Sequence, residues 1–134
     1  MTSRHVSVWI DAAPEVVYAI AADPQQLHRW ASGLAGGALR QTADGWVADS
    51  PMGEVIVEFA PANEYGVLDH VVRLPSGEWV YNPFRVVPAG GGEARCEAVF
   101  TVRRQRGMTD EEFDDDAAAV GADLDRLRML AEDG

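Results

Sequence analysis

The longest regular pattern of apolar and polar residues lies at the C-terminal end of the chain. From Thr109 to about Glu132, apolar residues recur every three or four positions, as on one face of a helix: Phe113, Ala117, Val120, Leu124, Leu127 and Ala131. Thr109 and Glu112 have the Thr-x-x-Glu spacing of a capping box, which predicts the helix start. At about 1.5 Å per residue, this helix is long enough to cross a small domain. The preceding chain must therefore cover its apolar face.

The apolar face of this helix carries little side-chain volume in its middle. Ala117, Val120 and Gly121 are small, whereas leucines fill the second half at positions 124, 127 and 130. A glycine inside a helix costs about 1 kcal/mol relative to alanine, so Gly121 needs a physical reason. Two interpretations are open: a neighbouring backbone approaches closely there, or an internal space lies beneath the first half of the helix.

The N-terminal part of the chain predicts one strand followed by two short helices. Residues 3–10 are rich in β-branched and aromatic residues and end at Asp11, which is typical of a short strand. Pro14 and Glu15 mark the start of the first helix. Asp23 is placed to cap a second helix, which carries Leu27, Trp30 and Ala31.

From residue 38 onwards the apolar period changes from helical to extended. Segments bounded by glycine, proline, asparagine or aspartate are predicted as strands at 38–42, 45–50, 54–60, 67–74, 78–87 and 94–103. The short connections between them favour an antiparallel meander. With the first strand, this order predicts an α+β fold, in which a curved seven-stranded antiparallel sheet wraps around the long C-terminal helix.

Two strings and the order of elements resemble one known superfamily. The strings are VSVWIDAAPEVVYAIAADPQQLHRW at 6–30 and FTVRRQRGMTDEEFDDDAAAVGADLDRLRMLAE at 100–132. They are similar to the START-like or SRPBCC superfamily, which has the helix-grip fold, and within it to the bacterial branch that is polyketide cyclase/dehydrase-like. The resemblance covers essentially the whole chain, so residues 1–134 are expected to form a single domain. It implies an apolar cavity between the long helix and the sheet, but the superfamily holds both carriers and enzymes.

Strand alternation selects the side chains that should face such a cavity. The sets that begin at Leu68, Val80 and Ala94 are apolar or uncharged at every second residue, so these faces are predicted to point inward. For residues 45–50, Trp46, Ala48 and Ser50 are favoured. We expect Trp30 and Trp46 at the cavity mouth, because an indole offers broad apolar area with one donor. The predicted ligand-binding residues are Trp30, Leu34, Trp46, Ser50, His70, Asn82, Phe84, Phe100, Gly121 and Leu124.

Three polar residues fall on this otherwise apolar wall: Ser50, His70 and Asn82. A buried polar group without a partner costs on the order of 1–3 kcal/mol, so each should bond to protein, water or ligand. His70 has three interpretations: a satisfied core imidazole, a ligand-binding group or a proton-transfer group. Asn82 precedes Pro83, which cannot donate to a sheet ladder, so this point is either a bulge that aims the amide inward or an irregular strand edge.

The charge of the chain is uneven. Of the formal net charge of −11, residues 109–134 contribute −8, from ten acids against two arginines. The acids predict a solvated helix face, and they argue against nucleic acid, whose binding requires neutralisation of phosphates. The basic residues are all arginines, a composition that hints at a GC-rich bacterial genome. The N-terminus lacks a signal-peptide pattern and no apolar run is long enough to span a bilayer, so a soluble, cytoplasmic protein is expected.

Recognisable catalytic or metal motifs are missing. His5, His28 and His70 lack metal-ligand spacing, and no pattern indicates a cofactor. Cys96 is the single cysteine, so no intrachain disulfide forms.

Three functions remain open. The favoured one is binding of a mostly apolar small molecule, such as a lipid, polyketide or aromatic metabolite, between the sheet and the C-terminal helix. The alternatives are a cyclase or dehydratase-like enzyme acting on a polyketide or aromatic precursor, with His70 moving a proton, and an interaction protein with a vestigial cavity. The sequence makes no prediction of the oligomeric state.

Overall fold

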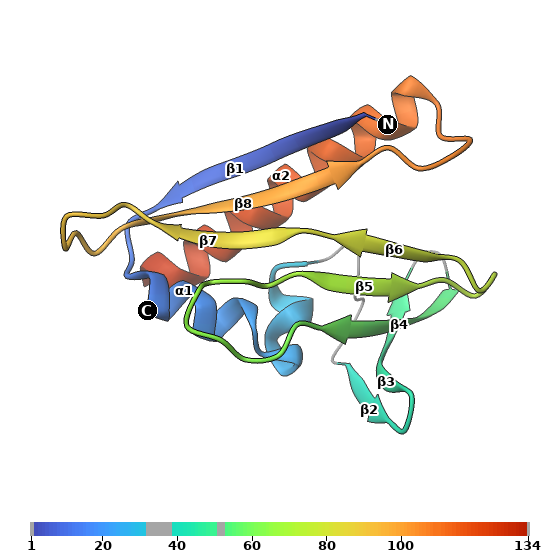
Figure 1. The fold of residues 1–134 in the computed structure, drawn as a ribbon, viewed down its shortest axis with the longest axis horizontal. Coiled ribbons are helices and arrows are strands. Elements are labelled where there is room, and N and C mark those ends of the chain that lie inside the picture. Colours follow the sequence, from blue (N-terminus) through green and yellow to red (C-terminus); the bar gives the residue numbers. More distant parts are fainter. Residues whose placement is uncertain (1, 32–38, 51–52, 134) are drawn as a thin grey trace.

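The chain folds into strands that cover one side of a long helix (Figure 1). The computed structural model describes residues 2–31, 39–50 and 53–133. The elements are, in order, β1 (Ser3–Ile10), α1 (Pro14–Ala21), the 3₁₀ helix η1 (Pro24–Arg29), β2 (Arg40–Thr42), β3 (Gly45–Ser50), β4 (Gly53–Phe59), β5 (His70–Arg73), β6 (Trp79–Asn82), β7 (Phe84–Pro88), β8 (Cys96–Arg103) and α2 (Asp110–Asp133). The predicted α+β class and helix-grip arrangement are confirmed.

The described strands form two antiparallel sheets, ordered β1-β8-β7 and β2-β3-β4-β5-β6. The prediction of one seven-stranded sheet is wrong in this respect, because the strand expected over 78–87 divides at Pro83, which has no N–H for a ladder. The two sheets remain joined by backbone hydrogen bonds: Thr101 N donates to Pro83 O at 2.9 Å, and Leu68 N donates to Phe84 O at 2.8 Å. The break at Pro83 is therefore a bend within a continuous wall.

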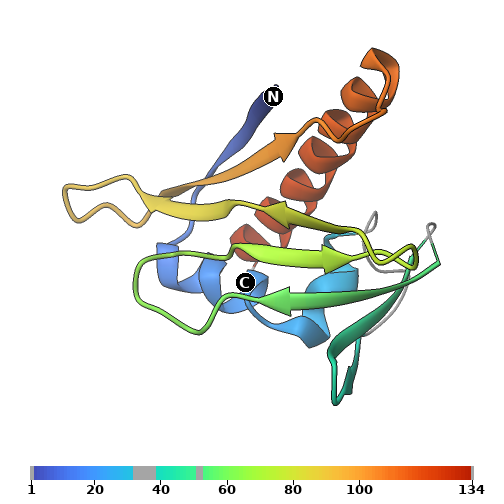
Figure 2. The ribbon, with the colours of Figure 1, turned by 45° about the vertical axis from the view of Figure 1, so that its right-hand side comes forward.

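Helix α2 begins where its capping box predicts. Glu112 N donates to the Thr109 hydroxyl at 3.1 Å, and Thr109 N donates to the Glu112 carboxylate at 2.9 Å, so two otherwise unpaired N–H groups are satisfied. The residues that α2 buries are Phe113, Leu124, Leu127 and Ala131. α2 packs against β1 and β8, and Figure 2 shows α1 close to its C-terminal half.

The two short helices close one end of the space between α2 and the sheets. α1 starts at Pro14, as predicted, and buries Val17 and Ala21. η1 is a 3₁₀ helix, in which the Asp23 carboxylate accepts a hydrogen bond from Gln25 N at 3.0 Å. Trp30 ends η1 and is buried. Among the described helices, none has both the length and the apolar character needed to cross a bilayer.

Candidate ligand-binding cavity

An apolar cavity of about 390 Å³ lies between α2 and the sheets. Its end walls come from α1 and η1, its long wall from β4 to β8, and its cover from the first half and middle of α2. The larger apolar side chains on its surface are Leu27, Trp30, Phe59, Phe84, Phe100 and Leu124. The helix-grip arrangement thus leaves an internal space that its own side chains do not fill.

Aromatic rings form a continuous row along the cavity. The Trp30 and Phe84 ring centroids are 5.8 Å apart, and those of Phe84 and Phe100 are 5.4 Å apart. His70 continues the row, at 5.8 Å from Phe100 and 6.2 Å from Phe59. These distances lie within the range of favourable tilted and edge-to-face contacts. The row gives the wall a rigid, flat-sided surface.

Six of the residues predicted from sequence line the cavity: Trp30, His70, Asn82, Phe84, Phe100 and Leu124. His70 and Asn82 lie directly opposite each other in the β5–β6 register, so the two polar groups are neighbours on one face. Pro83 follows at the bend between the sheets. The irregularity expected at Asn82 and Pro83 is thus present, and it leaves Asn82 on the cavity side.

Trp46 and Ser50, which were also predicted, lie away from the cavity. Trp46 packs against the core from β3, which is separated from β5 by β4. The Ser50 hydroxyl donates to Gly53 O at 2.8 Å in the β3–β4 hairpin. Neither side chain reaches the cavity lining, because a shared sheet face does not by itself bring distant strands to one place. Leu34 and Met52, which the sequence favours as loop residues at the cavity entrance, lie outside the described residues.

Gly121 faces β1, away from the cavity. A Cβ atom built on it would lie 3.8 Å from Val6 Cγ1, an ordinary contact. The glycine therefore marks the line along which α2 packs on β1. The cavity instead meets α2 at Asp116, Ala119, Val120, Asp123 and Leu124.

This placement predicts that Gly121→Ala stabilises the protein without altering ligand binding. The added methyl group has room, and alanine favours the helix by about 1 kcal/mol relative to glycine. Chemical denaturation of the variant and the wild type measures the difference. A loss of stability would mean that α2 and β1 are closer than the Val6 contact indicates.

His70 is buried on the cavity wall, and within the described part of the chain only one of its ring nitrogens is hydrogen-bonded to protein. Its Nδ1 lies 3.1 Å from Leu68 O, and a carbonyl oxygen can only accept, so Nδ1 carries the proton. This tautomer leaves a lone pair on Nε2. Burial lowers the pKa of His70, against the smaller opposing effect of the Leu68 carbonyl. The imidazole is therefore neutral at pH 7.

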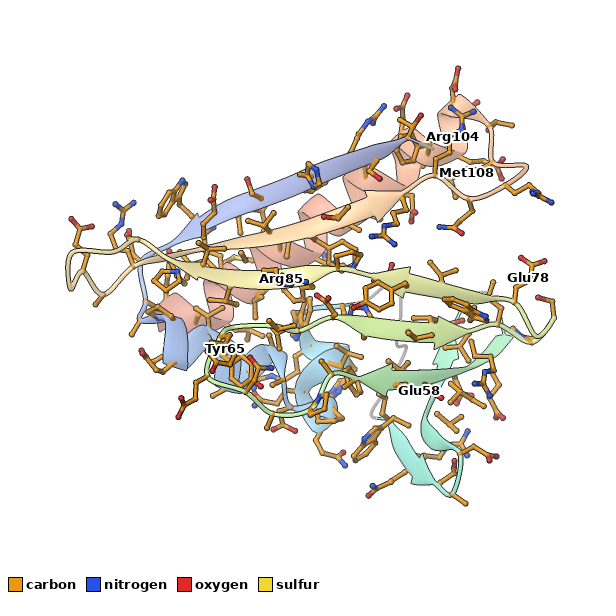
Figure 3. The ribbon with its side chains drawn as sticks, in the orientation of Figure 1. Glu58, Tyr65, Glu78, Arg85, Arg104 and Met108 are labelled. Atoms are coloured by element: carbon orange, nitrogen blue, oxygen red, sulfur yellow. The ribbon has the colours of Figure 1, made fainter. Side chains whose placement is uncertain are left out.

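The exposed lining residues place the cavity mouth at the first half of α2. Asp116 and Ala119 are exposed there, and partial burial raises the pKa of the Asp116 carboxyl. Asp123, which is less exposed, is paired with Arg126. Met108 and Gln105 complete this rim from the segment before α2; Figure 3 shows Met108 beside Arg104, whose Nη2 donates to Met108 O at 2.9 Å.

Sequence reasoning missed the acidic part of this lining. Only the apolar stripe of α2 was considered, whereas Asp116 and Asp123 lie four residues before and three residues after Val120, on the same side of the helix. This spacing is the signal that would have identified them. Within the described part of the chain, no three His, Cys, Asp or Glu side chains come together as a metal ion requires.

A polar cluster lies on the outer face of the sheets, opposite the cavity. Asp69 is buried there, and it accepts hydrogen bonds from Arg85 Nε at 2.9 Å, Arg85 Nη2 at 2.8 Å, Tyr81 Oη at 2.7 Å and Phe84 N at 2.9 Å. The Arg85 guanidinium is the main cause that holds the pKa of Asp69 well below its usual range. Figure 3 shows Arg85 on β7, with α2 behind the sheet. The cluster ties β5, β6 and β7 together at the bend.

Comparison with known proteins gives one family and several similar folds. The sequence matches the family model described as "Polyketide cyclase / dehydrase and lipid transport" over residues 1–132. The solved structure of XoxI from Bacillus cereus is similar, with a TM-score of 0.74 and 13% identity, over 97% of this chain and 95% of XoxI. A protein from Thermobifida fusca has a TM-score of 0.65 and 20% identity, over 98% and 93% of the two chains.

A third similar structure comes from a biosynthetic locus. DynU16, from the dynemicin biosynthetic locus, has a TM-score of 0.67 and 19% identity, over 97% of this chain and 47% of DynU16. At these identities the likeness concerns the fold alone. No curated protein matches the sequence.

Proposed function

Because the chain belongs to the polyketide cyclase/dehydrase and lipid-transport family, we propose that it binds a mostly apolar small molecule in the cavity between α2 and the sheets. The single observation that carries this proposal is the cavity of about 390 Å³ with its apolar, aromatic wall. Ligand pockets for small molecules span about 300–1,000 Å³, so this cavity is suited to a compact ligand. A lipid fragment, a small polyketide or an aromatic metabolite fits this description.

Affinity in such a site comes mainly from burial of apolar surface, at roughly 25 cal/mol per Å². The row from Trp30 through Phe84 and Phe100 to His70 offers ring faces and edges to a flat ligand. His70 and Asn82, side by side on β5 and β6, supply the polar contacts that fix its orientation. This division between apolar burial and a few polar groups is typical of binding sites.

A valine on α2 provides a direct test. Val120 is half-buried and lines the cavity, so Val120→Phe places additional volume inside it. We expect naphthalene, titrated by calorimetry, to bind at least about tenfold more weakly to this variant, because lost contact area weakens apolar binding. Thermal unfolding of the variant checks that its fold is retained.

Val16→Phe is the matched control. Val16 is a helical valine on α1 that is exposed and absent from the cavity wall, so the same substitution there should leave naphthalene binding unchanged within about twofold. Equal effects of the two substitutions, or binding that is indifferent to Val120→Phe, would rule out this cavity as the binding site.

A cyclase or dehydratase-like activity is the second candidate. The observation that favours it is the neutral His70 with a free Nε2 lone pair on the cavity wall, since such a group can accept a proton from a bound molecule. Incubation of the protein with small aromatic polyketide precursors, followed by mass analysis of the extracted ligand, distinguishes the two. A carrier returns the molecule unchanged, whereas an enzyme returns a dehydrated product by a reaction that His70→Gln slows.

A further inference from the structure

The cavity contains two polar groups that lack a protein partner and can only accept hydrogen bonds. The first is His70 Nε2. Its ring is 9% exposed, and the Nδ1 proton is committed to Leu68 O at 3.1 Å, so Nε2 presents a lone pair. No described residue donates to that lone pair. A ligand that does not donate to Nε2 leaves this buried acceptor without a hydrogen bond, which costs binding free energy.

The second acceptor is the Asp116 carboxylate at the cavity mouth. No described side chain forms an ion pair or a hydrogen bond with it. Asp114, two residues earlier, pairs with Arg4, whereas Asp116 is an exposed residue of the cavity lining. The N-terminal half of α2 also carries Asp110, Glu111, Glu112, Asp114 and Asp115. Arg104 pairs with Asp110 and Arg4 pairs with Asp114, so acidic side chains remain in excess around the mouth.

The cations and most of the donors near the cavity are already occupied. Arg103, which lines the cavity, places its guanidinium over the Tyr81 ring, 5.6 Å from the ring centroid. Arg126 is paired with Asp123 and donates to Trp30 O at 3.1 Å. Gln105 Nε2 donates to Arg103 O at 2.9 Å. Among the described lining residues, the charge of Arg126 is therefore compensated by Asp123, whereas Arg103 keeps its positive charge and contacts the Tyr81 ring.

The two other donors near the cavity, Trp30 Nε1 and the Asn82 amide, do not favour a carboxylate ligand over a hydroxyl ligand. Trp30 Nε1 has no hydrogen-bond partner among the described residues, but it is fully buried, so a ligand oxygen does not reach it without movement of the wall. The Asn82 amide can donate or accept and therefore does not discriminate between the two kinds of ligand. The groups that discriminate are His70 and Asp116.

On the basis of the proposed function, we infer that the ligand is a hydrogen-bond donor: a mostly apolar molecule whose hydroxyl group donates to His70 Nε2, and not a carboxylate such as a fatty acid. A carboxylate would bring its own lone pairs against that of Nε2 and its charge past Asp116. A protonated His70 would offer a donor at Nε2 to a carboxylate, but burial disfavours the imidazolium form.

Four probes of one shape separate this inference from simple apolar binding. At pH 7, 2-naphthol is neutral and donates, 2-methoxynaphthalene has the oxygen without the proton, 2-naphthoate is an anion, and naphthalene is the apolar reference. We expect 2-naphthol to bind about tenfold more tightly than 2-methoxynaphthalene, the size of one net hydrogen bond. We expect 2-naphthoate to bind more weakly than naphthalene.

Two variant pairs assign the preference to its residues. His70→Phe should remove the advantage of 2-naphthol over 2-methoxynaphthalene, and His70→Gln, which keeps an acceptor, should retain part of it. Asp116→Asn should reduce the difference in binding affinity between 2-naphthoate and naphthalene. Asp115→Asn removes the same charge at an exposed position outside the lining, so it should reduce that difference less.

The outcomes distinguish this inference from the function on which it rests. If naphthalene binds and 2-naphthoate binds as tightly as 2-naphthol, the cavity is a binding site and the donor inference is wrong. If 2-methoxynaphthalene matches 2-naphthol in the wild type, the role given to His70 is wrong. If none of the four probes binds, the proposed function itself fails, and the inference falls with it.

Discussion

Gly66→Ala is expected to destabilise the protein by at least about 3 kcal/mol, because left-handed backbone costs a non-glycine residue about 1–2 kcal/mol and a backbone clash adds to that cost. Gly66 has φ +72°, and a Cβ atom on it would lie 2.2 Å from Val86 O. The two residues are held together, since Val86 N donates to Gly66 O at 2.9 Å. The loop before β5 and strand β7 cannot separate without breaking this link. Urea unfolding of both proteins measures the loss.

Gly77→Ala is the control for the backbone conformation alone. Gly77 has φ +91°, but no atom of residues 2–31, 39–50 or 53–133 lies within 4 Å of the position that its Cβ would occupy. This variant should lose only about 1–2 kcal/mol, the cost of the conformation. Equal losses at the two glycines would show that the approach of Gly66 to Val86 contributes nothing.

Asp69→Asn is expected to destabilise the protein by about 3 kcal/mol, as breaking a buried ion pair does. The side chain of Asp69 is 7% exposed, and its carboxylate is held by both Nε and Nη2 of Arg85. The same carboxylate also satisfies Phe84 N at 2.9 Å and the Tyr81 hydroxyl at 2.7 Å. The neutral amide loses the charge–charge attraction and presents N–H groups to donors. The loss should appear in urea unfolding at pH 7.

The pH dependence of this effect has a definite sign. The folded-state pKa of Asp69 is depressed, mainly by the Arg85 hydrogen bonds, so its contribution is present above the unfolded value of about 3.9 and is lost as the pH falls below that value. The difference between wild type and Asp69→Asn should therefore shrink in acid.

Glu58→Gln is the matched control for Asp69→Asn. The Glu58 and Arg73 side chains are 51% and 49% exposed and 3.4 Å apart, so this substitution should cost less than about 1 kcal/mol. If Asp69→Asn cost no more than Glu58→Gln at pH 7, the buried cluster would contribute only as a surface pair does.

Much of the fold was predictable because the decisive signals are local. The capping box of Thr109 and Glu112 specifies the start of α2, and it forms as expected. Alternation along the strands placed His70, Asn82, Phe84 and Phe100 on one face, because side chains of a strand alternate whatever the strand pairs with. Where the physics depends on neighbouring residues in sequence, the prediction and the structure agree.

The differences arise where the pairing of distant segments decides the result. Pro83 indicated an irregularity, but the division into two sheets depends on how β7 pairs with β8 and with the chain before β5. Gly121 carried two interpretations, and only the position of β1 places it against Val6. Trp46 shares an orientation with the cavity residues but lies too far across the sheet.

The outer face shows the same limit. Alternation placed Asp69 outward, which normally means solvent, yet Arg85 and Tyr81 from the adjoining strands bury it. The register that brings these three residues together cannot be read from periodicity. The apolar wall of the cavity was therefore easier to predict from the sequence than the Asp69 cluster or the acidic lining residues Asp116 and Asp123.

Methyl NMR during titration with naphthalene tests whether the cavity between α2 and the sheets binds an apolar small molecule. We expect saturable shifts at methyl groups of the lining: Val72, Val80, Val102, Val120 and Leu124. Val16 and Val87, which are exposed and outside the lining, should remain unchanged. Shifts that are absent at saturating naphthalene, or as large at Val16 and Val87 as at the lining, would contradict binding in the cavity.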